Sequence, residues 1–484
     1  MAKKSKNDQV PTPVSYVEDM LDRIGYRNKI VGKKVLENSC GQGNILVSVV
    51  KRYILDAKEQ GLSYQAIVVG LQQDIIAFDT DEKQIEVCIR RLDDICAKEG
   101  IPKVRWNISN QDFLKYDVKQ INASYVIGNP PYITYHDIKE EDRKFLQEHF
   151  TVCKKGRFDY CYAFIEASIN SMSLDGKMIY LIPFSIFRNR YAENLRKFLK
   201  NEIINVVDFS GRKVFPGITC SSAFLICEKG NCLDYVIYDR IESGERIIIE
   251  KKELSAEGKK WVFQNTTSGK FEFGDYFNVY NSVATLLNEA FLFYPESETA
   301  DMFCTKRGMI EKNVCLPAIS TKSKKREDKT EEKEQLKQQY IIFPYKIKGK
   351  TIDRFAEEEF RNKYPQAYVY LSRFKEKLEN RTSDKNIYWF EYGRGQLLNA
   401  LWEEKLVMPM VVTKQAKVYK AGDNTVPYAG YFITQKKNSN YTLKDAEKIL
   451  KSKAFYQYVK DVGTPTTETS YRVSVDDIKR FKFE

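Results

Sequence analysis

The fold is decided by a strand, a glycine turn and the start of a helix, which read Lys34-Val35-Leu36-Glu37-Asn38-Ser39-Cys40-Gly41-Gln42-Gly43. The apolar character of 34–37 predicts a short buried strand, and helical periodicity follows over 45–55. The small residues in between let the backbone approach a ligand closely, and the N-terminus of the helix presents free N–H groups. This unit is typical of a parallel sheet and predicts a ligand-binding turn. A tight turn that binds no ligand is the alternative.

Strands and helices alternate over about the first 230 residues. This alternation predicts a doubly wound parallel α/β sheet that helices cover on both faces. Apolar runs predict one strand within 66–78 and further strands at 124–128, 177–183, 203–209 and 222–227. Helical periodicity is found at 17–24, 82–98 and 158–172.

The pattern changes after about residue 230, where short β-rich pieces and charged helical stretches mix without regular order. We therefore expect two domains, an α/β domain over 1–230 and an α+β domain over 231–484. In the second domain, the almost apolar-free run 321–339 indicates an exposed loop or a surface helix. The end of the chain predicts a helix at 443–462 and a strand at 471–475.

The composition narrows the classes of partner and site. A formal net charge of +12 suits a polyanionic partner. No apolar run approaches the roughly 20 residues that cross a bilayer, so we expect no membrane association. The chain has ten cysteines without a CxxC pair and only two histidines, His136 and His149. Free thiols in a reducing cytosol and the absence of a metal site are the expectations that follow.

The acid at the end of the first strand, Glu37, narrows the ligand that suits the glycine turn. Dinucleotide sites carry the pattern GxGxxG, whereas this turn has only Gly41 and Gly43. A carboxylate in this place repels a pyrophosphate but pairs with an ammonium group. S-adenosylmethionine carries an amino group and a sulfonium and has no phosphate, so it fits this turn.

Two further acids follow the second and third strands. Asp79 stands where a carboxylate accepts hydrogen bonds from both ribose hydroxyls of a nucleoside. The alternative is that Asp79 or Asp81 caps the next helix. Asp112 is placed to accept a hydrogen bond from an adenine amino group, with Phe113 stacked on the ring, and the alternative is a solvated loop.

The strand at 124–128 runs into Asn129-Pro130-Pro131-Tyr132. Two prolines fix φ and remove two N–H donors, so the carbonyl of Pro130 and the side-chain oxygen of Asn129 can both accept from one amino group. An exocyclic amine delocalises its lone pair into its ring, and two acceptors free that lone pair for attack on a methyl group. Tyr132 supplies a ring that stacks on a planar substrate. A Pro-Pro turn with a core tyrosine is the alternative.

Taken in order, these motifs resemble those of gamma-class DNA adenine-N6 methyltransferases, over about residues 11–229. The resemblance implies a Rossmann-like methyltransferase fold, S-adenosylmethionine as the cofactor and adenine in DNA as the substrate. It assigns cofactor binding to Thr12, Pro13, Glu37, Asn38, Cys40, Gly41, Gly43, Asp79, Asp112, Phe113 and Asn129. It assigns catalysis to Asn129, Pro130, Pro131 and Tyr132, and the contact with a flipped base to Tyr132 and Phe215. The sequence departs from the family pattern at Asn38, where proline or alanine is usual, and at Asn44, where a small residue or proline is common.

The second half of the chain suits contacts with DNA. A base inside a duplex cannot reach such a site, so enzymes of this chemistry rotate the nucleotide out of the helix. Basic residues that can contact phosphates or guanine edges are Lys306, Arg307, Lys322 to Arg326, Lys346, Lys348, Lys350, Arg373, Lys375, Arg381 and Arg394. The region 440–482 resembles target-recognition domains of the same family. We expect 231–484 to be a DNA target-recognition domain, although a solvated charge is the alternative for each basic residue.

The expected reaction is direct methyl transfer to N6 of a flipped adenine in double-stranded DNA, without a metal or a covalent enzyme intermediate. Methylation of a protein glutamine or of an RNA base is one alternative, and a non-catalytic DNA-binding specificity protein is another. About ten residues precede Thr12, so we expect no nuclease fused in front of it. A separate restriction endonuclease is a candidate partner, and both monomer and dimer stay open. The expected location is the cytoplasm, for a protein that is bacterial or phage-encoded and associates with the nucleoid through DNA.

Overall fold

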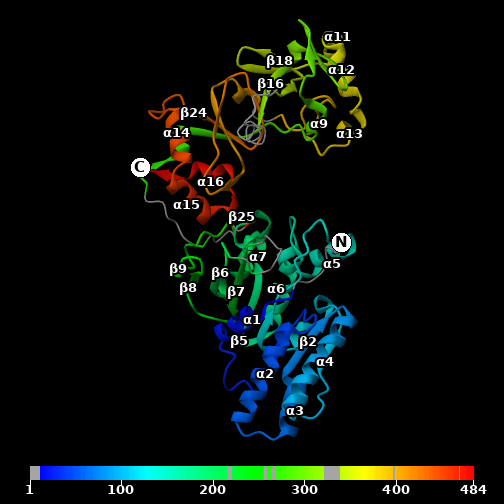
Figure 1. The fold of residues 1–484 in the computed structure, drawn as a ribbon, viewed down its shortest axis with the longest axis vertical. Coiled ribbons are helices and arrows are strands. Elements are labelled where there is room, and N and C mark those ends of the chain that lie inside the picture. The colour runs from blue at the N-terminus through cyan, green and yellow to red at the C-terminus, as the bar shows by residue number, and fades with distance from the viewer. Residues whose placement is uncertain are drawn as a thin grey trace. The chain divides into compact units, whose positions relative to one another are not determined.

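The structure, a computed structural model, describes residues 11–212, 214, 221–254, 259–263, 269–320, 338–395, 398–467 and 469–484. The chain forms two compact units (Figure 1). Unit 1 comprises Met1–Gln264 with Thr464–Thr469, and unit 2 comprises Asn265–Gly463 with Ser470–Glu484. Within the described residues, no helix is both long enough and apolar enough to cross a membrane.

In the described part of unit 1, nine strands form one sheet in the order β3-β2-β1-β4-β5-β7-β6-β8-β9. Neighbouring strands pair in parallel except where β7 or β9 takes part. The strands are β1 (Val35–Glu37), β2 (Ile75–Asp79), β3 (Asn107–Asn110), β4 (Ala123–Gly128), β5 (Met172–Pro183), β6 (Ile203–Asp208), β7 (Ser222–Glu228), β8 (Tyr235–Arg240) and β9 (Glu245–Glu250). This topology confirms the predicted doubly wound α/β sheet. The boundary predicted at residue 230 is wrong, because β8 and β9 extend the same sheet beyond it.

Helices cover both faces of this sheet (Figure 1). Side chains alternate along each strand, so that Val35 joins one core and Leu36 the other. One face packs against α1 (Val14–Arg23), α2 (Asn44–Glu59), α3 (Tyr64–Asp74) and α4 (Glu82–Lys98). The other face packs against α5 (Glu140–His149), α6 (Tyr160–Ser171) and α7 (Glu193–Glu202). The segment β25 (Thr464–Thr467) also lies with unit 1.

Helix α3 lies where the sequence pattern predicted a strand. Its apolar run contains β-branched residues, which favour a strand, and only Ile75–Asp79 is extended. A cap decides the outcome locally, because Ser63 accepts a hydrogen bond from the N–H of Ala66 at 3.2 Å. Ile67 and Leu71 then lie four residues apart on the buried face of the helix.

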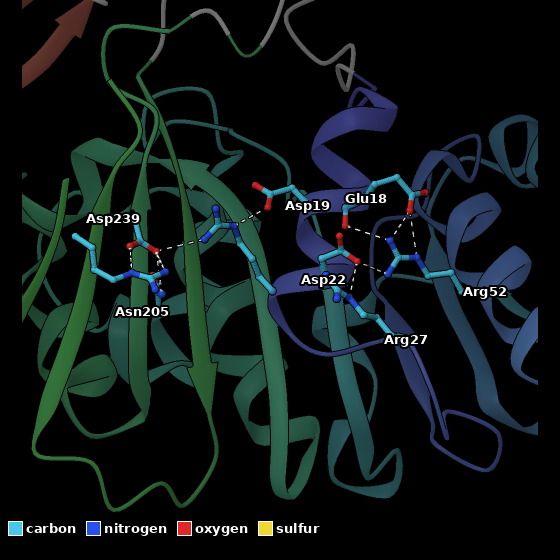
Figure 2. Close-up of polar contacts among 9 residues, drawn as sticks. Glu18, Asp19, Asp22, Arg27, Arg52, Asn205 and Asp239 are labelled. Carbon is cyan, nitrogen blue, oxygen red and sulfur yellow. Dashed lines mark hydrogen bonds and ion pairs between the residues drawn. The ribbon is translucent and has the colours of Figure 1, made fainter. Parts of the chain in front are cut away.

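A network of charged groups fastens α1 to its neighbours (Figure 2). On one side, Arg52 of α2 donates to the carboxylates of Glu18 and Asp22, and to the carbonyls of Glu18 and Tyr26. On the other side, Arg23 of α1 reaches Asp239 of β8 at 3.3 Å. Helix α1 is therefore held to α2 and to the far half of the sheet at the same time.

Unit 2 mixes short sheets with helices, which confirms the predicted α+β class. Its strands are β10 (Phe271–Glu272), β11 (Phe277–Asn281), β12 (Leu292–Phe293), β13 (Ser297–Glu298), β14 (Met302–Thr305), β15 (Gly308–Glu311), β16 (Cys315–Ser320), β17 (Tyr340–Ile342), β18 (Tyr345–Lys348), β19 (Thr351–Arg354), β20 (Lys405–Met408), β21 (Val411–Thr413), β22 (Tyr419–Ala421), β23 (Val426–Ala429), β24 (Tyr431–Gln435), β26 (Ser470–Arg472) and β27 (Lys482–Phe483). Its helices are α8 (Phe273–Tyr276), α9 (Asn288–Phe291), α11 (Glu357–Lys363), α12 (Pro365–Ser372), α13 (Lys375–Glu379), α14 (Leu443–Leu450), α15 (Lys453–Val462) and α16 (Val475–Lys479).

Two predictions for unit 2 need correction and one falls outside the described residues. The helix predicted at 443–462 is two helices, because Ser452 caps α15 by accepting from the N–H of Phe455 at 3.1 Å. The strand predicted at 471–475 ends at Arg472, and the capping box of Ser474 starts α16. Residues 321–337 of the run predicted as a loop or surface helix lie outside the described part of the chain.

Candidate functional site

A cavity of about 880 Å³ opens at the carboxyl ends of β1, β2 and β4 in unit 1. The strand order changes direction between β1 and β4, and open α/β sheets bind ligands at such a point. Most residues of the predicted site line this cavity, namely Thr12, Glu37, Asn38, Cys40, Gly41, Asp79, Asp112, Phe113, Asn129, Pro130, Pro131 and Tyr132. The fold thus brings together motifs that lie more than a hundred residues apart in the chain.

The glycine turn adopts a backbone that requires glycine. Gly41 and Gly43 have φ values of 49° and 76°, in the left-handed region. A Cβ on Gly43 would lie 2.5 Å from Sγ of Cys88, so a side chain has no room either. Gly43 is the N-cap of α2, and Cys40 lines the cavity. A hydrogen bond with Cys88, together with burial, raises the pKa of Cys40, which keeps its thiol neutral.

Glu37 ends β1 with an acid that is only 3% exposed. Burial raises the pKa of Glu37 well above its ordinary value, and Cys88 and Asp79 act in the same direction. Its Oε2 accepts no hydrogen bond from any residue that the structure describes. A buried carboxylate oxygen at the wall of a cavity suits a ligand that brings a positive charge and N–H donors.

Asp79 links the second strand to the glycine turn. Its Oδ2 accepts from the N–H of Gly41 at 2.7 Å, and its Oδ1 accepts from the N–H of Asp81 at 2.9 Å. Helix α4 is capped by Asp81, whose Oδ1 accepts from the N–H groups of Lys83 and Gln84. Capping therefore does not account for Asp79. A carboxylate accepts up to about four hydrogen bonds, so Asp79 retains capacity for hydroxyl groups of a ligand.

An aromatic wall closes the cavity beside Asp112. Phe113 is 1% exposed, and its ring centroid lies 5.4 Å from that of Phe78 and 6.0 Å from that of Phe164. Tyr160 continues this wall, with its ring 5.6 Å from that of Phe164. Asp112 caps a 3-10 turn by accepting from the N–H of Leu114 at 3.0 Å and still lines the cavity. An aromatic wall with one carboxylate at its edge suits a planar heterocycle that carries an amino group.

The segment after β4 lines the cavity beside the glycine turn. Asn129 is 7% exposed, and its carbonyl accepts from Oγ of Ser39 at 3.3 Å. The hydroxyl of Tyr132 donates to the carbonyl of Leu181 at 2.6 Å, which fixes the ring at the end of β5. The Tyr132 side chain stays 38% exposed. A ring that is held at its hydroxyl end and partly exposed in the cavity suits stacking on a planar substrate.

The N-terminal segment completes the rim through a relay of hydrogen bonds. Nη1 of Arg91 donates to the carbonyl of Gln42 and to Oδ1 of Asn44, both at 2.6 Å. Nδ2 of Asn44 donates to the carbonyl of Thr12 at 3.5 Å. Thr12 is 3% exposed and lines the cavity, whereas Pro13 is the N-cap of α1 and does not.

Three residues of the predicted site are not among those that line the cavity. Pro13 and Gly43 shape the turns beside it. Phe215, the candidate for stacking on a flipped base, lies outside the described residues. Conversely, Tyr160 and Phe164 line the cavity and were not predicted as site residues. Their spacing of four residues on a helix places both on one face, and this signal is present in the sequence.

In unit 2, several predicted DNA-contacting residues have partners within the protein. Arg381 donates to the carbonyls of Leu378, Thr285, Trp389 and Glu391, so it stabilises the fold of this unit rather than presenting its donors to DNA. In addition, Lys346 pairs with Glu359, Lys348 with Asp353, and Lys375 with Glu379. Salt bridges of lysines at a surface are weak, so these ammonium groups can still exchange a carboxylate for a phosphate.

Comparison with known proteins finds relatives among restriction-modification methyltransferases. Residues 47–215 match the family described as Eco57I restriction-modification methylase. The type II restriction enzyme and methyltransferase RM.Eco57I of Escherichia coli is 23% identical over 329 residues, which cover 60% of this chain and 33% of the relative. The type II methyltransferase M.HincII of Haemophilus influenzae is 31% identical over 166 residues, which cover 33% of this chain and 32% of the relative.

The fold also has a solved counterpart. The type IIL restriction-modification enzyme MmeI, solved in complex with DNA, has a TM-score of 0.59 at 13% identity, with 97% of this chain and 66% of that chain covered. The likeness therefore includes both units of the chain, and it concerns the fold alone. The chain spans from 31% to 47% of the length of the curated relatives that it matches.

Proposed function

We propose that this protein is a site-specific DNA methyltransferase that transfers the methyl group of S-adenosylmethionine to N6 of a flipped adenine. The observation that carries the proposal is that Asn129-Pro130-Pro131-Tyr132 lines the same cavity as Glu37, Asp79, Asp112 and Phe113. The matches to type II methyltransferases agree with this chemistry.

The residues present fit S-adenosylmethionine. On this proposal, the buried oxygen of Glu37 pairs with the amino group of the cofactor. Asp79 accepts hydrogen bonds from the ribose hydroxyls. Phe113 stacks on the adenine ring of the cofactor, and Asp112 accepts a hydrogen bond from the adenine amino group. When bound, the cofactor supplies an electrophilic methyl group. The two-glycine turn lets the backbone approach without offering the phosphate cradle of a dinucleotide site.

The protein's own residues prepare the nucleophile. Asn129 and the carbonyl of Pro130 accept hydrogen bonds from the target amino group and draw it out of conjugation with its ring. Tyr132, fixed at its hydroxyl by Leu181, stacks on the base. Methyl transfer leaves an acidic ammonium on the product, so its proton passes to solvent and no dedicated base is needed.

DNA is the partner that the basic chain favours. The net charge of +12 attracts the phosphate backbone, and phosphate contacts offset the cost of flipping a base, which is a few kcal/mol. We assign the catalytic role to unit 1 and target recognition to unit 2. On this proposal the protein works in the cytoplasm where bacterial DNA lies, and a separate endonuclease is a candidate partner.

Substitution Asn129→Ala tests the proposal. It removes an acceptor of the target amine, so we expect the methylation rate to fall by at least about a hundredfold while duplex binding stays within about twofold. Labelled S-adenosylmethionine with duplex DNA measures the first quantity, and a gel-shift titration measures the second. A control, Asn205→Ala, removes an amide of β6 that contacts Asp239, outside the cavity lining, and should leave the rate unchanged.

The same assay separates the alternatives. Label in protein or in RNA, with none in duplex DNA, would replace the proposed substrate by a glutamine or an RNA base. Duplex binding by a wild-type protein that does not bind the cofactor would instead identify a non-catalytic specificity protein. Sequencing of the labelled DNA then tests adenine N6 as the acceptor and reveals the sequence context.

A further inference from the structure

Three buried polar side chains, Asn38, Ser168 and Tyr180, form a closed ring of hydrogen bonds beside the cavity. The hydroxyl of Tyr180 donates to Oδ1 of Asn38 at 2.7 Å, and Nδ2 of Asn38 donates to Oγ of Ser168 at 2.7 Å. Oγ of Ser168 lies 2.5 Å from the hydroxyl oxygen of Tyr180. Because the tyrosine proton already points to Asn38, Ser168 is the donor of this third bond. Each side chain therefore donates once and accepts once, and the bonds run around the ring in one direction.

The ring joins three elements that meet under the site. Asn38 follows Glu37 directly and lines the cavity, Ser168 belongs to α6, and Tyr180 belongs to β5. All three side chains are buried, with exposed fractions of 2%, 0% and 0%. Polar groups at this depth cost free energy unless they are paired, and the ring pairs them with one another.

Tyr180 also touches the segment that carries the target-amine acceptors. It is the pairing partner of Gly128 between β4 and β5, and a Cβ on Gly128 would lie 2.8 Å from Cε1 of Tyr180. Gly128 directly precedes Asn129. One side chain thus packs beneath the start of the Asn-Pro-Pro turn with its ring and holds the start of the glycine turn with its hydroxyl.

The ring restrains the backbone at Asn38. A proline at this position would fix φ by itself, whereas asparagine leaves the backbone freer. The ring restores the restraint, because Asn38 cannot move without breaking two buried hydrogen bonds at once. Each buried group that loses its partner is costly, so the restraint is steep.

We propose that Tyr180 and Ser168 are positioning residues, which hold the glycine turn in register with Asn129 and so align the methyl donor with the target amine. This inference rests on the proposed function. It predicts that opening the ring weakens cofactor binding and also lowers the rate at saturating cofactor, while DNA binding is unchanged.

Substitution Tyr180→Phe opens the ring and keeps the aromatic packing on Gly128. We expect the Kd for S-adenosylhomocysteine, measured by calorimetry, to rise about tenfold, which corresponds to about 1.4 kcal/mol. The single-turnover methylation rate at saturating cofactor should fall about tenfold as well. Ser168→Ala is the milder second variant and should shift both quantities in the same direction.

Tyr53→Phe is the matched control. Tyr53 is equally buried, and its hydroxyl donates to Asp74 at 2.6 Å, but neither residue lines the cavity. This variant should lose stability yet keep the wild-type Kd and rate. The inference is overturned if Tyr180→Phe and Ser168→Ala behave like Tyr53→Phe, with lower stability and an unchanged Kd and rate.

The double variant Tyr180→Phe with Ser168→Ala tests closure of the ring. Either substitution alone opens it, so the two effects on Kd should combine to clearly less than their product. Independent, multiplying effects would contradict a ring.

Because the Kd needs no methyl transfer, a wild-type protein that binds S-adenosylhomocysteine but methylates no DNA would refute the proposed function and leave the Kd test decisive for the ring. A wild-type protein that does not bind S-adenosylhomocysteine would refute both the proposed function and the inference about the ring.

Discussion

At the residue scale, Glu37 lines the cofactor cavity of the proposal and lowers the stability of the folded protein without cofactor. Its carboxyl is buried, and burial raises its pKa. In the unfolded chain a glutamate ionises near a pH of about 4.3. A group with a raised pKa in the folded state contributes its full stability below the unfolded pKa and loses it as pH rises through the folded pKa. The folded protein without cofactor is therefore destabilised by Glu37 at neutral pH.

Substitution Glu37→Gln separates the effect of Glu37 on stability from its effect on cofactor binding. The amide does not ionise, so the free energy of unfolding of the variant should exceed that of the wild type increasingly as pH rises above about 4.3. Cofactor affinity should fall at the same time, because the partner of its ammonium group is gone. Denaturant unfolding at several pH values and calorimetry measure the two quantities. A variant that is less stable than the wild type at neutral pH, or that binds the cofactor equally well, would contradict this account.

At the element scale, α1 depends on the charged network of Arg52 (Figure 2). Four acceptor groups of the segment from Glu18 to Tyr26 converge on the guanidinium of Arg52. Burial of Glu18 opposes its ionisation, but hydrogen bonds from Ser48 and Arg52 lower the pKa of Glu18 overall. Because α1 begins directly after Thr12 and Pro13, its position against α2 sets the rim of the cavity.

Substitution Arg52→Met keeps the apolar stem and removes these bonds. We expect a loss of about 1–2 kcal/mol in the free energy of unfolding, since the pairs are partly exposed. The KM for the cofactor should rise, while kcat should change little. Arg27→Met is the control, because Arg27 pairs with Asp22 at 2.9 Å and its side chain is 60% exposed. Thermal unfolding and steady-state methylation measure these changes. Equal stability and equal KM of the two variants would contradict a role of the Arg52 network in positioning α1.

Element by element, periodicity predicted several strands and helices of unit 1 closely and missed α3, α5, α7, β8 and β9. The helix expected at 82–98 is α4 without change, and the strand before Asn129 differs by one residue at its start. These elements have strong periodicity and clear boundaries. Helix α3 escaped because its β-branched run favours a strand in isolation, and its cap and tertiary packing override that preference. In unit 2, Ser452 caps α15 and so divides the predicted helix 443–462, and Ser474 caps α16 and so shortens the predicted strand 471–475.

The cavity was predictable only in part, for a physical reason. Residues that we propose to contact a ligand directly, such as Asp79 and Tyr132, line the cavity and stand in recognisable motifs at strand ends. Residues that support them do not, because their partners are distant in sequence. Asn38 meets Tyr180 across 142 positions, and nothing local in either segment indicates the contact.

At the scale of the whole molecule, charge should govern association with DNA. The net charge of +12 implies release of counterions from the phosphate backbone on binding. We expect the logarithm of the association constant for a non-cognate duplex to fall linearly with the logarithm of salt concentration, by several units per decade. Fluorescence anisotropy titrations over a salt series measure this slope. A slope near zero would contradict DNA as the partner of the basic chain.

The ring of Asn38, Ser168 and Tyr180 also constrains how this site can be inherited. A proline in place of Asn38 would remove one hydrogen-bond partner from each of two buried hydroxyl groups and leave them paired only with each other, so the change costs less free energy when those hydroxyls are lost as well. The reverse path meets the same barrier, because an asparagine without Ser168 and Tyr180 would bury an unpaired amide. We therefore expect substitutions at the three positions to be epistatic, so that an exchange of the glycine turn costs less stability when the contacting residues of α6 and β5 are exchanged with it.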